Sequence, residues 1–158
     1  MLYNIGRVVG DSAYYYIYWR ALFMLKLMIG VKGTGKTKTL IQMVHNALEQ
    51  SNGAVVCLEK GKKLTFDIKS QCRLIDTEEY RVNTTDALFG MVAGILASNY
   101  DVTDLFIDSA LKICGDNVAE FDAFLDNVSA LTEACNVKCF ITSSIPEGEA
   151  SDTVKKYL

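Results

Sequence analysis

The sequence predicts an α/β domain in three layers, α/β/α, with helices on both faces of a mainly parallel sheet of about five strands. Short, nearly continuous apolar runs indicate strands that are buried on both faces. Helical apolar stripes alternate with these runs, which is typical of parallel strands joined by right-handed crossovers. Half of the 158 residues are apolar and 22% are charged, which fits one globular domain with a sizeable core.

Each element has its own local signal. A buried strand over Leu25–Ile29 leads into glycines, and a helix over Lys36–Gln50 ends at the polar residues 51–53. Thr84 or Thr85 is suited to cap the next long helix. We predict further strands over 54–58, 72–76, Val102–Ile107 and 137–142, and further helices over 86–98 and 116–135.

The aromatic N-terminal stretch stands apart from this pattern. We assign residues 24–158 to the domain and residues 1–23 to an extension outside its core. The stretch from Tyr14 to Trp19 has an interfacial composition, but no apolar run reaches membrane-spanning length. Three interpretations remain open: an element that covers an edge of the domain, a segment on a membrane surface, or an extension that precedes a natural start at Met24.

A glycine-rich loop (residues 30–37) joins the first strand to the first helix. It fits the pattern G-x-x-x-x-G-K-[ST] at every fixed position. Glycines let the backbone turn tightly and direct N–H groups at phosphate oxygens, and the helix adds the positive end of its dipole. We therefore assign nucleotide binding to Gly30, Val31, Lys32, Gly33, Thr34, Gly35, Lys36 and Thr37, with Lys38 at the end of the site.

Charged and hydroxyl groups suggest how a nucleotide would be held. Lys36 would neutralise the β- and γ-phosphates of ATP, and the Thr37 hydroxyl would bind Mg²⁺. Asp108 follows the strand 102–107 at the carboxyl edge of the sheet, where a carboxylate holds Mg²⁺ through water. We therefore predict a metal site made by Thr37 and Asp108.

With this loop and Asp108, the chain resembles the P-loop NTPase superfamily, in particular its RecA-like branch, over about residues 25–143. It also resembles small stand-alone bacterial proteins labelled as twitching-motility, PilT-like ATPases. The full motors carry an additional N-terminal domain and histidine-rich boxes, whereas this chain has one histidine, His45. We assign no role to His45. The resemblance implies a P-loop NTPase fold, Mg²⁺-dependent ATP binding and ATP hydrolysis.

The resemblance also bears on catalysis, for which we select Lys36 and Glu59. Many ATPases of this branch place a Glu directly after the metal-binding Asp, but here Ser109 follows Asp108. RecA-like proteins can take the Glu from the neighbouring strand, where Glu59 lies. The alternative for Glu59 is a solvated charge at a strand end. Polar residues at the end of the last strand could sense the γ-phosphate: Thr142, Ser143 and Ser144.

We expect slow turnover, because the only arginines after residue 24 are Arg73 and Arg81 and neither has an evident place beside the phosphates. The chain would then act as an ATPase or an ATP-driven switch. The alternatives are a small-molecule kinase, a DNA-associated motor or loader, and a nucleotide-binding interaction module that does not hydrolyse ATP. The residues that follow Asp108 and Asn136 lack the GTPase motifs, so guanine specificity is not expected.

Charge and cysteine content limit the partners. A net charge of −3 does not favour nucleic acid, and the one basic cluster reads first as a solvated loop: Lys60, Lys62, Lys63 and Lys69. An unidentified protein partner or self-assembly remains open. Five cysteines without a C-x-x-C pair suggest neither a disulfide framework nor a zinc site, and a reducing cytoplasm fits them best.

Overall fold

The computed structural model describes residues 24–158, and the N-terminal extension predicted over 1–23 lies outside this range. The described residues form an α/β fold around a five-stranded sheet in which all strands run parallel. The spatial order is β1-β5-β4-β2-β3, so β5 separates β1 from β4. The strands are β1 (Leu25–Ile29), β2 (Ala54–Glu59), β3 (Arg73–Asp76), β4 (Val102–Ile107) and β5 (Lys138–Ser143).

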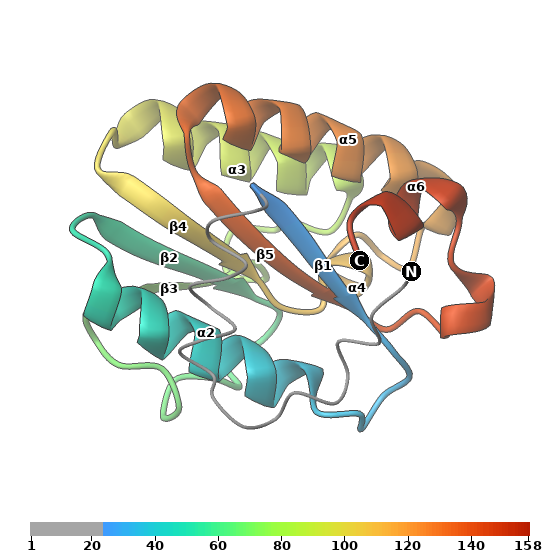
Figure 1. The fold of residues 1–158 in the computed structure, drawn as a ribbon, viewed down its shortest axis with the longest axis horizontal. Coiled ribbons are helices and arrows are strands. Elements are labelled where there is room, and N and C mark those ends of the chain that lie inside the picture. The colour runs from blue at the N-terminus through green and yellow to red at the C-terminus, as the bar shows by residue number, and fades with distance from the viewer. Residues whose placement is uncertain (1–23) are drawn as a thin grey trace.

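Helices cover both faces of this sheet and give the predicted three layers (Figure 1). One face carries α2, and the other carries α3 and α5, which pack against each other. The helices are α2 (Lys36–Gln50), α3 (Thr85–Ser98), α4 (Ala110–Ile113), α5 (Val118–Cys135) and α6 (Asp152–Lys156), with a 3₁₀ turn η2 (Glu147–Glu149).

The sheet divides the apolar core into two clusters. Leu40, Val44 and Phe106 belong to the cluster beneath α2, and all three are fully buried. Leu88 and Phe121 belong to the larger cluster beneath α3 and α5. The central strands β4 and β5 contribute to both clusters, which explains why they read as continuous apolar runs.

A thirteen-residue excursion, residues 60–72, leads from the end of β2 to the start of β3. Its polar sequence predicted a solvated loop. Lys62, Lys63 and Lys69 are indeed exposed, but Leu64 and Ile68 bury their side chains in the cluster beneath α2. The excursion is therefore anchored to the core at two points, and its lysines extend from this anchored backbone.

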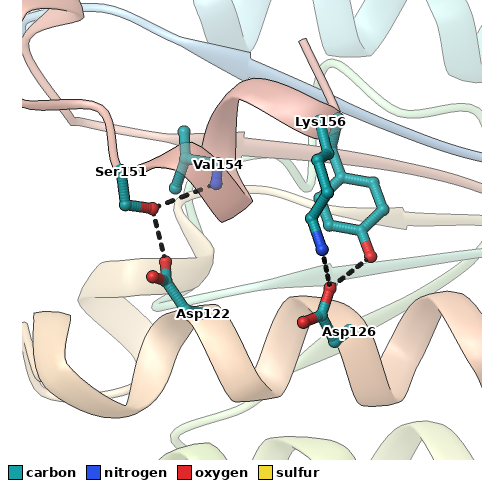
Figure 2. A network of polar contacts seen from close by, with 6 residues as sticks. Asp122, Asp126, Ser151, Val154 and Lys156 are labelled. Carbon is teal, nitrogen blue, oxygen red and sulfur yellow. Dashed lines mark hydrogen bonds and ion pairs between the residues drawn. The ribbon is translucent and has the colours of Figure 1, made fainter.

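The C-terminal segment folds back onto α5 and β1 (Figure 2). Ser151 caps α6 by accepting from Val154 N and donates to Asp122, while the Tyr157 hydroxyl and Lys156 both donate to Asp126. The carbonyl of Tyr157 accepts from Leu27 N at 2.7 Å. The segment thus fixes the outer side of β1, the strand that leads into the glycine-rich loop.

Several predicted bounds differ from the observed ones by one or two residues, and two short helices were not predicted. The helix predicted from residue 116 begins at Val118, because Asp116 takes a left-handed conformation and Asn117 caps the helix by accepting from Glu120 N. The helices α4 and α6 span four and five residues, too short for a periodic signal. Within residues 24–158, no helix is long and apolar enough to cross a membrane.

Candidate functional site

Three glycines of the loop have a positive φ that favours glycine: Gly30, Gly33 and Gly35. Gly30 has a φ of +152°, and a Cβ there would lie 2.8 Å from the Thr34 hydroxyl oxygen. Gly35 has a φ of +86° and precedes the first residue of α2. A side chain at Gly30 would therefore meet a neighbour, and one at Gly35 would strain the backbone. These glycines allow β1 to turn directly into α2.

The first turn of α2 lacks the features that usually stabilise a helix N-terminus. No side chain caps it, and it contains no acidic residue. It contains Lys36 and Lys38 instead, although positive charge is unfavourable at the positive end of a helix dipole. Open N–H groups, the dipole and two lysines together make this helix start suited to an anion.

The Lys36 ammonium lies within the loop. Its Nζ donates to Gly30 O and to Val31 O, both at 2.8 Å, and lies 3.4 Å from the Thr34 hydroxyl. Burial lowers the pKa of Lys36, while the nearby negative charge of Asp108 opposes that shift. The ammonium is thus held by neutral carbonyls, and phosphate oxygens would be stronger, charged acceptors at the same place.

Asp108 lies beside the loop although 71 residues separate it from Thr37. The Thr37 hydroxyl is 3.2 Å from Asp108 Oδ1, and Thr142 donates to the same oxygen at 2.7 Å. The strand order explains this contact, because β5 carries Thr142 between the loop after β1 and the end of β4. A hydroxyl and a carboxylate thus meet at the carboxyl edge of the sheet.

These two oxygen donors fit magnesium. Within residues 24–158, no group of three or more His, Cys, Asp and Glu side chains could hold a metal ion. Mg²⁺ does not need such a group, because proteins usually bind it with one or two side chains and leave the other positions to phosphates and water. Thr37 and Asp108 are the residues that would hold it.

Thr142 and Ser143 also hold the start of α4. Ser109 has a left-handed backbone, with a φ of 56°, and its N–H donates to the Thr142 hydroxyl at 2.8 Å. The Ser143 hydroxyl accepts from Leu111 N at 3.3 Å. Thr142 therefore connects Asp108 to the backbone of the next element, whereas Ser144 is exposed.

Glu59 is buried, which excludes the alternative of a solvated charge. Only 2% of the residue is exposed, and Oε2 accepts from Lys63 N at 3.1 Å and Leu64 N at 2.9 Å. Burial raises the pKa of Glu59, the two backbone hydrogen bonds oppose that shift, and the charges of Asp76 and Asp108 add to it. A raised pKa suits a general base, but one carboxylate oxygen already anchors the excursion.

Arg73 and Arg81 lie near the edge of the sheet that is opposite the glycine-rich loop. Arg73 begins β3, which is separated from β1 by three strands, and Arg81 follows the same strand. His45 lies on α2, and its buried Nε2 has no hydrogen-bond partner among the described residues. None of these three residues joins the group around Lys36 and Asp108.

Sequence reasoning missed Asp76 and the strained backbone of Ser109. Asp76 Oδ1 accepts from Gly61 N at 2.8 Å and from Glu78 N at 3.0 Å, so it fixes the other end of the excursion. An Asp that precedes Thr and Glu at a strand end signals such a turn. The positive φ of Ser109 has no signal in the sequence, since a serine there favours no particular conformation.

Comparison with known proteins adds no family. Neither a scan against models of protein families nor a search of curated proteins produced a match for this chain. The loop, Lys36, Thr37 and Asp108 are therefore the features from which a function can be inferred.

Proposed function

We propose that this protein is a P-loop NTPase of the RecA-like kind that binds ATP with Mg²⁺ at residues 30–37. The observation that carries this proposal is the uncapped start of α2, which places Lys36 inside a glycine-rich turn next to the Thr37 and Asp108 pair. Each of these groups has a partner in a nucleotide. The helix start and Lys36 match phosphate oxygens, and the Thr37 and Asp108 oxygens match the metal.

The proposed hydrolysis is slow. Glu59 is the candidate base, but its Oε2 is engaged by two backbone N–H groups, and no Glu follows Asp108. A base must lie within hydrogen-bond reach of the water that it activates. Arg73 and Arg81 lie at the β3 side of the sheet, so charge on the transferred phosphoryl group would lack a guanidinium from residues 24–158.

The contacts of Thr142 favour an ATP-driven switch over a simple ATPase. Its hydroxyl donates to Asp108 and accepts from Ser109 N, directly before α4. A metal ion held by Asp108 would weaken the hydrogen bond from Thr142 to Asp108. The hydrogen bond from Ser109 N to Thr142 would then weaken as well. The start of α4 would then respond to occupancy, which is how a bound nucleotide orders or releases a neighbouring segment in a switch.

The test combines nucleotide selectivity with turnover on the purified chain. We expect Mg²⁺-dependent binding of ATP, weaker binding of GTP, and slow phosphate release that Lys36→Ala abolishes. Glu59→Gln should keep ATP binding and lower phosphate release if Glu59 is the base. Binding without any phosphate release would identify a non-hydrolysing module, and absence of ATP binding would reject the proposal.

A further inference from the structure

A cavity of about 600 Å³ lies between the excursion (residues 60–72) and β3. The edge strand β3 forms one wall, and the excursion forms the other. Ile68 and Leu74 give it an apolar part. Its charged lining consists of three carboxylates and three cations: Glu59, Asp76 and Glu79, and Lys62, Lys69 and Arg73.

The three carboxylates of this cavity already have donors. Glu59 accepts from two backbone N–H groups of the excursion, and Asp76 accepts from Gly61 N and from its own turn. Glu79 forms an ion pair with Lys62. The negative charge on the wall is therefore compensated by the protein itself.

Two of the three cations lack comparable compensation. Lys69 pairs with Glu49 at 3.9 Å between Nζ and Oε1, and both side chains are more than half exposed. Such an exposed pair contributes little and is easily exchanged. Arg73 is exposed and has no ion pair with any residue from 24 to 158. Positive charge thus remains at one end of the cavity.

The two cations belong to one short segment, residues 69–73, all of which line the cavity. Cys72 N donates to Lys69 O at 3.0 Å, which closes a turn and sets Lys69 and Arg73 on either side of it. Ser70 and Gln71 lie at the tip of the turn and also line the cavity. The turn and the first residue of β3 thus offer a guanidinium, an ammonium and a hydroxyl, which are donors that phosphate and carboxylate groups prefer.

We propose that this cavity binds a small molecule through an anionic group, phosphate or carboxylate, held by Lys69 and Arg73. Ile68 and Leu74 contact the apolar part of the bound molecule. The other end of the cavity reaches Glu59, and β2 adjoins β4, where Asp108 N donates to Leu58 O at 2.9 Å. A bound molecule lies one strand away from the proposed nucleotide site, although the cavity does not depend on that site.

The experiment is a titration of ¹⁵N-labelled protein with sodium phosphate and, separately, with sodium succinate, at ionic strength held constant with sodium chloride. We expect saturable shifts of the Ser70, Gln71 and Arg73 amide signals. Arg73→Met should weaken this binding by about tenfold or more, because a charged hydrogen-bond donor is lost. Arg81→Met is the matched control, since Arg81 is an exposed arginine that does not line the cavity, and its loss should leave the affinity unchanged.

Two further comparisons separate this site from the proposed nucleotide site. Lys36→Ala should remove any phosphate response of the glycine-rich loop and leave the shifts at Ser70 and Gln71 intact. A response to only one of the two anions supports the site and identifies the group that it accepts. Shifts that do not saturate, that sodium chloride reproduces, or that persist unchanged in Arg73→Met overturn the proposal.

Discussion

The two halves of the sheet's carboxyl edge use similar residues in different ways. Around β1, β5 and β4, the polar side chains contact one another and loop carbonyls: Lys36, Thr37, Asp108 and Thr142. Around β2 and β3, the carboxylates of Glu59 and Asp76 bind backbone N–H groups of the excursion. In the first half, Thr142 and Ser143 accept from backbone N–H groups only at the start of α4, whereas in the second half the carboxylates themselves anchor the excursion.

The largest expected effect comes from removing the Glu59 carboxylate, and the matched change in the other half is made at Asp108. Glu59→Ala leaves the buried Leu64 N–H without its acceptor, so we expect a loss of about 2–3 kcal/mol in the free energy of unfolding. Glu59→Gln should cost much less, because the amide oxygen can still accept. Urea denaturation followed by circular dichroism measures both.

Asp108→Asn is the matched change in the other half. We expect its free energy of unfolding to stay within about 1 kcal/mol of the wild type, because the amide oxygen can accept from Thr142. Its ATP binding should become independent of Mg²⁺. Equal losses of stability in Asp108→Asn and Glu59→Ala would contradict the division between the two halves.

Gly30→Ala tests the geometry of the loop. The added methyl would lie 2.8 Å from the Thr34 hydroxyl at a φ of +152°, so the turn must distort. We expect ATP affinity to fall by about tenfold or more, which corresponds to the usual cost of a strained residue. Gly90→Ala is the control, because a Cβ there has open space within α3, and its affinity should not change. Calorimetric titration of both variants decides the point.

Some features of the fold and the site could be predicted from the sequence and others could not. The bounds of β1, α2 and β4 were predicted correctly, because continuous apolar runs and flanking glycines are local signals. The sequence predicted that Thr37 and Asp108 share a metal site, from the loop motif for Thr37 and from the strand end for Asp108. The sequence did not predict that β5 lies between β1 and β4, since strand order depends on contacts between distant segments.

Glu59 illustrates the limit most clearly. The sequence Glu59-Lys60-Gly61-Lys62 is polar and left both a catalytic and a solvated interpretation open. Its burial depends on Leu64 and Ile68, which carry the excursion back into the core. Local composition does not predict that the excursion packs against the core. The hydrogen bonds from its backbone to Glu59 could therefore be found only in the structure.

The pH dependence of stability should differ in sign between Glu59 and Asp126. Burial raises the pKa of Glu59, so its contribution is greatest below its ordinary pKa and declines as pH rises through the raised value. The Tyr157 hydroxyl, with Lys156, lowers the pKa of Asp126, so that contribution exists above the ordinary pKa and is lost as pH falls through the lowered value. Melting temperatures of wild type, Glu59→Gln and Asp126→Asn from about pH 3 to pH 8 test this. The same slope in all three would refute it.

The smallest expected effect lies in the C-terminal segment. Asp126→Asn weakens the bonds from Tyr157 and Lys156, whose contacts with Asp126 Figure 2 shows. We expect a loss of about 0.5 kcal/mol, as is usual for exposed ion pairs. Lys155→Ala, which removes a more distant pair with Asp152, should cost less still. Urea denaturation at neutral pH compares the two, and a larger loss in Lys155→Ala would contradict the assigned role of Asp126.

The most direct test of the central claim compares two lysines of the same helical turn. Lys36 points into the glycine-rich loop, whereas Lys38 is exposed. Calorimetric titration with MgATP should show that Lys36→Ala loses affinity by about 100-fold or more, because a buried charged donor to phosphate is removed. Lys38→Ala should lose much less, because its exposed charge at the end of the site is screened by water and salt. Equal affinities in the two variants, or no binding by the wild type, would contradict a nucleotide site at this loop.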